Sequence, residues 1–173
     1  MQPNRFTIDG LDTPIGRALL VTDDEGALRA FHWDDHEDHL HRWLRSHYGA
    51  DVSLRTGCAP GAVRDAVEAY FAGELTRIDA IPCRAAGTPF QQSVWAALRA
   101  IPVGRTTSYG ALAAALGAPK ATRAVGLANG SNPIGVIVPC HRVIGANGSL
   151  TGYGGGLHRK RWLLAHEGVL LAV

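Results

Sequence analysis

The chain has 173 residues, of which 46% are hydrophobic and 18% are charged. These values are typical of a globular protein with enough chain for one large domain or two small ones. No apolar run approaches the ~18 residues of a membrane-spanning helix, and residues 1–16 lack the apolar core of a signal peptide. The sequence therefore predicts an intracellular, cytoplasmic protein with no membrane partner.

The formal net charge of +2 hides two halves of opposite sign. Residues 1–87 carry nine arginines against fourteen acids, a net −5, whereas residues 88–173 carry eight basic residues against Glu167 alone, a net +7. A basic half suggests a polyanionic partner, usually nucleic acid. A basic face that is merely solvated is the alternative that charge alone leaves open.

The three cysteines, Cys58, Cys83 and Cys140, are odd in number and widely spaced, and no CxxC motif is present. This pattern favours free thiols in a reducing compartment over a disulfide framework. A bond between Cys58 and Cys83 remains an alternative, and it would require an oxidising compartment.

Residues 1–87 have the pattern of a small α/β domain with an antiparallel sheet and a structural role. In chain order we expect a strand from Thr7, a hairpin of residues 16–21 and 27–31 with its turn at 23–26, an exposed helix over 34–48, a helix over 62–71 that ends at Gly73, and an extended segment followed by a loop over 78–87. Gly26 suits a positive φ in the hairpin turn.

Histidines concentrate in the segment 32–47, where His36, His39 and His41 raise the question of a zinc site. No cysteine lies nearby, and no second pair of ligands stands at a familiar spacing. A solvated helical face is favoured, and we predict no metal.

Residues 88–173 are expected to form a mostly helical domain. A capping box at 88–91 predicts the start of its first helix. Two short helices follow over 109–116 and 120–130, and a tight glycine-containing turn joins them. Inside a basic half, this arrangement predicts a helix-turn-helix. The predicted fold class is therefore α+β, with one domain at 1–87 and a second at 88–173.

The second helix of that pair is poor in large polar side chains and offers only Arg123 and Asn129. A reader of the major groove normally presents several Arg, Asn or Gln residues to the base edges. Small residues instead permit close approach of the backbone, which suits sequence-independent binding in the minor groove. A buried packing helix is the alternative.

The strongest candidate for chemistry is Cys140. We expect the apolar run 134–138 to form a strand that Pro139 ends, so that Cys140 points away from the ladder. A thiol beside His141 and Arg142 indicates a reactive nucleophile. A buried cysteine that merely packs is the alternative.

A loop with six glycines follows at 145–156, and it could wrap closely over a planar ligand around Tyr153. Phosphate binding by this loop is disfavoured because no strand-turn-helix frame surrounds it. The last helix, expected over 157–166, places Arg159, Lys160 and Arg161 together.

Several motifs surround Cys140 in a fixed order. They are Ser-Tyr-Gly-x-Leu-Ala upstream, Arg-Ala-Val-Gly and Asn-Pro before it, Pro-Cys-His-Arg-Val around it and Leu-Leu-Ala-His-Glu-Gly after it. In these motifs residues 88–173 resemble the O6-alkylguanine-DNA alkyltransferases from end to end. Residues 1–87 resemble the N-terminal domain of that family only loosely.

The resemblance implies direct-reversal DNA repair. The protein would bind double-stranded DNA containing O6-alkylguanine through the minor groove, rotate the base out of the stack, and move the alkyl group irreversibly to Cys140, once per molecule. The resemblance also implies activity on O4-alkylthymine, a methyltransferase without a cofactor, and a monomer in solution. Cooperative assembly on DNA is left open.

The resemblance also assigns roles to matching positions. Cys140 is the acceptor, His141 connects it through a water to Glu167, Asn132 shapes the site, and Tyr109 protonates the departing guanine. Arg123 fills the place of the flipped base. The other implied DNA contacts are Ala121, Thr122, Ala124, Gly126, Ala128, Gly130 and Ser108. The implied substrate pocket consists of Tyr109, Val143, Tyr153, Gly154 and Gly155.

The sequence departs from the family at Gly154, where some members carry a serine that can bond guanine O6. Backbone N–H groups must then make that contact, and the pocket has room for bulkier adducts. Two alternative functions remain. A sensor or regulator would recognise alkylated DNA without transfer, and a Cys-His hydrolase or acyltransferase would turn over a small ester.

Overall fold

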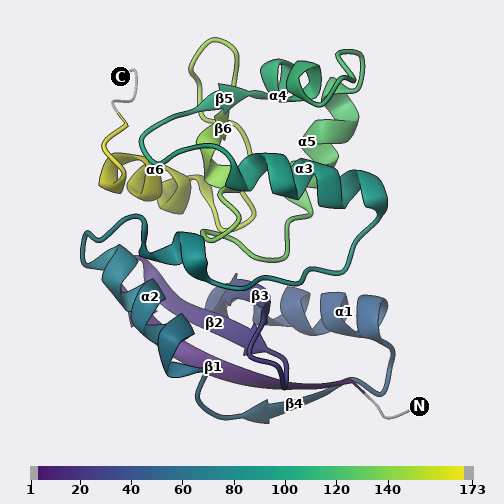
Figure 1. Cartoon of the computed structure of the whole chain (residues 1–173), viewed down its shortest axis with the longest axis vertical. Coiled ribbons are helices and arrows are strands. Elements are labelled where there is room, and N and C mark those ends of the chain that lie inside the picture. Colours follow the sequence, from purple (N-terminus) through teal and green to yellow (C-terminus); the bar gives the residue numbers. More distant parts are fainter. Residues whose placement is uncertain (1–3, 170–173) are drawn as a thin grey trace. The chain divides into compact units, whose positions relative to one another are not determined.

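The computed structural model describes residues 4–169, and Figure 1 traces their course. The chain divides between Ala86 and Gly87 into two compact units. Among the described residues, the first unit combines a sheet with two α-helices, and the second contains four α-helices and one short two-stranded ladder. The predicted α+β fold class is therefore confirmed. Among the described residues, no helix is both long and apolar enough to cross a membrane.

The first unit is built on a four-stranded sheet of order β3-β2-β1-β4. The strands are β1 (Arg5–Thr13), β2 (Gly16–Thr22), β3 (Leu28–Trp33) and β4 (Ser53–Thr56). The predicted antiparallel pairing holds for β1, β2 and β3, whereas β4 joins β1 in parallel. The prediction did not include β4. A helix carries the chain over the sheet before β4, and parallel strands require such a crossover.

The turn between β2 and β3 is fixed by Asp23. Its Oδ1 accepts hydrogen bonds from the N–H groups of Glu25 and Ala27, and its Oδ2 accepts one from Arg29. Gly26 has a φ of 83°, as predicted for this turn. These bonds hold the pKa of Asp23 below its ordinary value, although burial acts in the opposite direction.

Two helices cover the sheet. A 3-10 turn η1 (Asp34–His36) leads into α1 (Glu37–Tyr48), and α2 (Gly61–Phe71) follows β4. Residues 18–22 of β2 are all buried, so both faces of the sheet are covered. Leu40 and Leu44 of α1 pack with Leu19 and Val21. Figure 1 shows α2 on the opposite face.

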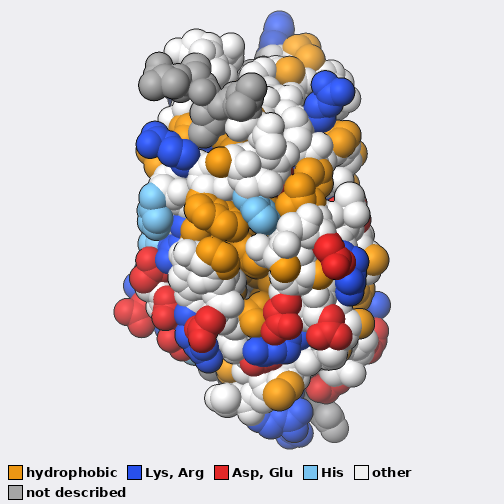
Figure 2. All heavy atoms as spheres, turned by 90° about the vertical axis from the view of Figure 1, so that its left-hand side faces the viewer, with side chains coloured by type: hydrophobic (Ala, Val, Ile, Leu, Met, Phe, Trp, Pro, Cys, Tyr) orange, Lys and Arg blue, Asp and Glu red, His pale blue; other side chains and the backbone are white. Residues whose placement is uncertain are grey.

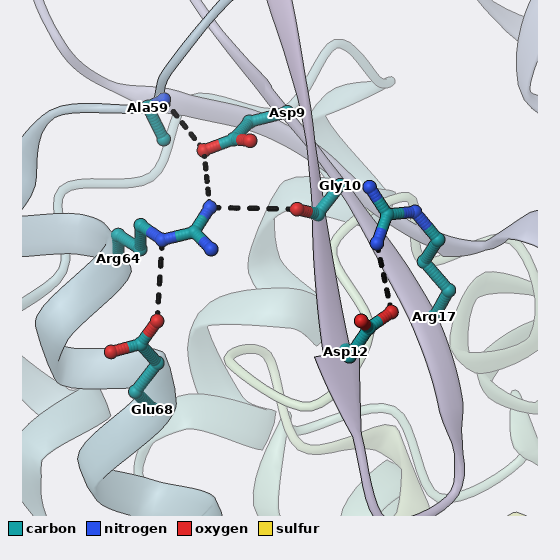
Figure 3. A network of polar contacts seen from close by, with 7 residues as sticks. All are labelled: Asp9, Gly10, Asp12, Arg17, Ala59, Arg64 and Glu68. Carbon is teal, nitrogen blue, oxygen red and sulfur yellow. Dashed lines mark hydrogen bonds and ion pairs between the residues drawn. The ribbon is translucent and has the colours of Figure 1, made fainter.

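A polar network attaches α2 to β1 (Figure 3). Arg64 Nη1 donates to Asp9 Oδ2 at 2.9 Å and to the Gly10 carbonyl at 3.4 Å, while its Nε lies 3.2 Å from Glu68. The same Asp9 oxygen accepts the N–H of Ala59 at 2.9 Å. The loop before α2 and the helix itself are thereby fixed to one strand.

The extended segment predicted at 78–87 begins instead as a 3-10 helix, η2 (Arg77–Ala80). Ile78 is buried there, and the Ile81 N–H closes a tight turn on its carbonyl. The chain then meets the start of β3, where Leu28 donates to Pro82 O and accepts from the Arg84 N–H. The local sequence did not indicate this turn.

The second unit begins with α3 (Pro89–Arg99) and continues through α4 (Tyr109–Ala115), α5 (Thr122–Gly130) and α6 (Leu157–His166). The predicted capping box is confirmed, because Thr88 and Gln91 exchange both hydrogen bonds. Ser108 Oγ accepts the N–H of Ala111 and so caps α4. Strand β5 (Thr107–Ser108) pairs in parallel with β6 (Val143–Ile144).

The pair α4–α5 has the expected two-helix arrangement, and α3 supports it. Trp95 of α3 is buried, and its Nε1 donates to the Ala128 carbonyl of α5 at 2.8 Å. Val125 of α5 is fully buried as well. The helix therefore presents one face to the core and leaves the other to solvent.

The strand predicted at 134–138 is wrong. The Val138 N–H bonds the Ile134 carbonyl and the Ile137 N–H bonds that of Gly135, so the segment is a compact turn. Val136 has a φ of 68°, which is costly for a β-branched residue and requires support from its surroundings. The large side chains of this run are buried, and among the described residues it forms no strand, only a single β-bridge at Ile134.

Candidate active site

Cys140 is the first residue of a 3-10 turn, η3 (Cys140–Arg142), directly after the compact turn 134–138. Asn132 shapes that turn. Its Nδ2 donates to the Val138 carbonyl at 2.8 Å, and its Oδ1 accepts the Ile134 N–H at 3.0 Å. The cysteine is 8% exposed, so its position is set by packing.

The environment of Cys140 acts on the thiol in two directions. Burial raises the pKa of the thiol, whereas a hydrogen bond from the Asn132 side chain and the positive charge of Lys160 lower it. Burial prevails, so the pKa lies above its ordinary value. The thiol therefore stays protonated at neutral pH, and forming the nucleophilic thiolate requires a base.

A buried charged cluster adjoins the cysteine. Glu167 Oε2 lies 2.8 Å from His141 Nε2, and Arg142 donates to both carboxylate oxygens, at 2.7 Å from Nε and 3.1 Å from Nη2. Arg142 Nη1 also donates to the Ile101 carbonyl. Exposures of 0% for His141, 2% for Arg142 and 4% for Glu167 place the whole cluster in the core.

This cluster fixes the state of the His141 ring. A carboxylate only accepts, so Nε2 carries the proton and donates it to Glu167. Burial lowers the pKa of His141, the Glu167 contact opposes that shift, and the ring remains neutral near pH 7. Within residues 4–169, no hydrogen-bond partner reaches the buried Nδ1. The ring therefore offers one basic nitrogen, on the residue that directly follows Cys140 in the sequence.

The glycine-rich loop is attached to α4 and α6 by two side chains. Tyr109 Oη lies 2.8 Å from Thr151 Oγ1. Lys160 is 0% exposed, and its Nζ donates to the carbonyls of Thr151 at 2.9 Å and Val143 at 2.6 Å. Burial lowers the pKa of Lys160, and the negative charge that Cys140 gains as a thiolate opposes that shift. Burial and the nearby thiol raise the pKa of Tyr153 well above its ordinary value.

The predicted pocket residues differ in exposure. Val143 and Gly155 are buried, Tyr153 is half-buried, and Gly154 is exposed. A side-chain Cβ built at Gly154 meets no atom within 4 Å, and its φ lies outside the left-handed region. Position 154 therefore does not require glycine.

Four of the eight predicted DNA contacts lie on the solvent side of α5. Thr122, Arg123, Ala124 and Gly130 are exposed, whereas Ala121, Ser108 and Gly126 are half-buried. A Cβ at Gly126 would lie 3.7 Å from the Tyr109 ring. Ala128 is 3% exposed on the side that faces Trp95, so it does not belong to the exposed face.

The three basic residues of the last helix differ in exposure. Arg161 is exposed, but Arg159 and Lys160 are buried and donate to the carbonyls of the loop, Arg159 Nη1 to Gly155 O at 2.9 Å. Two of the three charges thus support the loop. The single acid of residues 88–173, Glu167, is buried, so the acidic side chains visible in Figure 2 belong to the first unit.

The sequence did not predict that the side chains of three residues support the site through hydrogen bonds. These residues are Arg142, Lys160 and Thr151. Arg142 stands next to the Cys-His pair, but only the fold shows its two bonds to a residue 25 positions later. Lys160 lies in a basic run that is typical of a surface, and Thr151 carries no chemical signal in the sequence.

No group of three or more His, Cys, Asp or Glu side chains within residues 4–169 could hold a metal ion. His36 lies near Asp35, and His41 contacts Glu37 on the exposed side of α1. Within residues 4–169, no disulfide involves Cys58, Cys83 or Cys140.

The chain is similar to known proteins over most of its length. A family model described as 6-O-methylguanine DNA methyltransferase, DNA binding domain, matches residues 89–169. The methylated-DNA–protein-cysteine methyltransferase of Salmonella typhimurium is 50% identical over 96% of this chain and 98% of that protein. A relative of the same name from Mycobacterium bovis is 59% identical over 71% of each chain.

Solved structures of methyltransferases are also similar to this chain. The crystal structure of Mycobacterium tuberculosis OGT in complex with DNA has a TM-score of 0.78 and 47% identity, over 93% of this chain and 92% of that one. The O6-methylguanine-DNA methyltransferase of Pyrococcus kodakaraensis has a TM-score of 0.74 at 26% identity, over 95% and 99%. The chain belongs to the family of methylated-DNA–protein-cysteine methyltransferases.

Proposed function

We propose that this protein repairs DNA by moving the alkyl group of O6-alkylguanine, and of O4-alkylthymine, to its own Cys140. The observation that carries the proposal is a neutral imidazole, on the residue after Cys140, whose Nε2 is held by a buried carboxylate and whose Nδ1 has no hydrogen-bond partner among the described residues. The relatives' shared name supports methylated DNA as the substrate and a protein cysteine as the acceptor. We place this reaction in the cytoplasm.

The transfer balances without a cofactor. The thiol proton passes to His141 Nδ1 through a bound water, and the thiolate Sγ attacks the sp³ carbon of the alkyl group. A C–S bond forms as the C–O bond breaks, and its electron pair stays with the guanine. Tyr109 gives a proton to the departing base. The thiol's proton finally replaces the one lost by Tyr109, so the net exchange is alkyl for hydrogen.

The product is a thioether at Cys140, and the side chains around it are suited to ionising a thiol. They are not suited to breaking a C–S bond. Each molecule therefore reacts once. Backbone N–H groups near Gly154 are proposed to bind guanine O6, since this position lacks a side chain. Tyr153 and Val143 complete the pocket.

DNA binding is assigned to the exposed face of α5 within the helix-turn-helix. Thr122, Ala124 and Gly130 are small and exposed, which supports a close fit in the minor groove. Flipping a base costs a few kcal/mol of unstacking, and Arg123 offsets part of that cost by entering the vacancy. Residues 1–87 then serve as a structural domain, 88–173 bind DNA and react, and the protein acts as a monomer.

A duplex containing one O6-methylguanine tests the proposal. After incubation, peptide mass spectrometry should find one added methyl group on the peptide with Cys140 and an unmodified guanine in the DNA. Cys140→Ala should abolish transfer and retain DNA binding, whereas Cys58→Ala, at an exposed thiol, should react like the parent. Methylation of Cys58 or Cys83 would contradict the assignment. Cooperative assembly would appear as a sigmoidal binding isotherm.

A further inference from the structure

The phenol of Tyr109 has a defined partner, the hydroxyl of Thr151, at 2.8 Å. Thr151 lies in the glycine-rich loop, 42 positions after Tyr109, and both side chains are partly buried. We propose that Thr151 is a positioning residue for alkyl transfer, whose hydroxyl donates to the Tyr109 oxygen and holds it while the base departs. The inference rests on the proposed role of Tyr109 as the proton donor.

The direction of this hydrogen bond follows from counting protons. A phenol has one proton, and if that proton pointed at Thr151 it could not reach the base. Tyr109 can serve as an acid only when Thr151 supplies the proton in their shared bond. The threonine hydroxyl can supply this proton because it can act as a donor as well as an acceptor, and its proton rotates about the C–O bond.

The loop holds Thr151 in place through Lys160. The buried Lys160 Nζ bonds the Thr151 carbonyl at 2.9 Å and the Val143 carbonyl at 2.6 Å. Val143 in turn pairs with Thr107, two residues before Tyr109. Hydrogen bonds therefore connect α6 to the loop, the loop to Tyr109 at the start of α4, and α6 through Val143 to the β5–β6 ladder. The phenol and its partner are therefore positioned together.

The bond gains strength during the reaction. When Tyr109 gives its proton to the leaving base, its oxygen becomes a phenolate, and hydrogen bonds to charged groups are about twice as strong as neutral ones. Thr151 thus stabilises the transition state more than the ground state, which is the condition for accelerating the reaction.

Single-turnover transfer from a saturating O6-methylguanine duplex tests the inference in Thr151→Val, which keeps the shape and removes the hydroxyl. We expect a rate roughly 10- to 100-fold below the parent. Thr151→Ser, which restores the hydroxyl, should regain most of it. Alkylation of Cys140 by iodoacetamide is the matched control, because iodide leaves without a proton. Its rate should be the same in all three proteins.

A double variant separates the possible results. In a Tyr109→Phe background, adding Thr151→Val should slow transfer no further, since the shared bond is already lost. Equal slowing of transfer and of iodoacetamide alkylation by Thr151→Val would overturn the inference in favour of a general role in the loop. An undiminished transfer rate would also overturn it. If Tyr109→Phe itself transfers at the parent rate, the proposed role of Tyr109 is wrong instead.

Discussion

Glu167 and His141 are joined by a 2.8 Å hydrogen bond in the core of the second unit, 26 positions apart in sequence. The bond places the proton on Nε2 and leaves Nδ1 as the basic nitrogen of a neutral ring. Arg142 holds the same carboxylate from its other side. One acid therefore orients a base and neutralises a buried cation.

Glu167→Gln should both destabilise the protein and slow transfer. Breaking a buried ion pair costs about 3–5 kcal/mol when one charge is left unpaired, and loss of an oriented base slows a reaction by roughly 10²–10⁴. Thermal unfolding and single-turnover transfer measure the two effects. Glu68→Gln is the control, since Glu68 forms a half-exposed pair with Arg64 and should cost under about 0.5 kcal/mol. Similar losses in both variants would contradict the assigned role.

The rate of Cys140 alkylation should rise with pH over a higher pH range than the rate of an ordinary thiol does. Because the pKa of the Cys140 thiol is raised, the thiolate fraction is small at neutral pH and grows at higher pH than for an ordinary thiol of pKa about 8.5. The rate with iodoacetamide should therefore still rise where a small-molecule thiol has levelled off. A plateau at or below the pH of the free thiol would contradict the shift.

The same raised pKa of Cys140 affects stability. The unfolded chain releases the thiol proton at a lower pH than the folded chain does, so stability is lost as the pH rises from about 8.5 through the folded value. Tm measured at about pH 7.5 and about pH 9.5 should fall less in Cys140→Ala than in the parent. An identical fall in both proteins would show that other groups cause it.

Arg123→Ala should slow repair of O6-methylguanine in duplex DNA much more than transfer from the free base O6-benzylguanine. The exposed Arg123 is proposed to stabilise the flipped base and does not touch the thiol. Lys120→Ala, an exposed cation of the neighbouring turn, serves as the control and should affect the duplex reaction only modestly. Equal losses of Arg123→Ala on both substrates would assign Arg123 to the fold or the pocket.

Gly154→Ser should be tolerated and should favour small adducts. The new Cβ meets nothing within 4 Å, and one added hydrogen bond of roughly 0.5–1.5 kcal/mol gives about 2- to 13-fold faster transfer from O6-methylguanine. O6-benzylguanine should gain less or lose. Gly156→Ser is the opposite case, because Gly156 has a φ of 97° and its Cβ would lie 2.8 Å from the His158 ring. Equal slowing of both substrates by Gly154→Ser would refute the pocket model.

Much of this fold could be predicted where the signal is local. The capping box at Thr88 and Gln91 and the turn at Gly26 depend on neighbours in sequence, and both were predicted correctly. The strand predicted at 134–138 was wrong because a short apolar segment fits a strand and a buried turn equally well. Its Val136 conformation depends on surroundings that the sequence does not reveal.

The site divides in the same way. A Cys-His pair in a motif marks the chemistry, but the motif does not say that burial raises the pKa of the thiol. The sequence places Lys160 among basic residues of the last helix, but it does not show that this side chain is fully buried and bonds the carbonyls of Val143 and Thr151. Thr151 gave no signal, because a hydroxyl acquires its role only from the phenol that the fold brings to it.

The burial of Arg142, Arg159 and Lys160 limits how strongly salt can act on DNA binding. These three cations are buried and cannot contact a phosphate. The other basic residues of the second unit are Arg105, Lys120, Arg123 and Arg161, which are exposed, and Arg99, which is half-buried. Each neutralised phosphate contributes about −0.9 to the slope of log K against log salt concentration, so five give a slope no steeper than about −4.5. A steeper slope would mean that arginines of the acidic first unit also lie on the DNA.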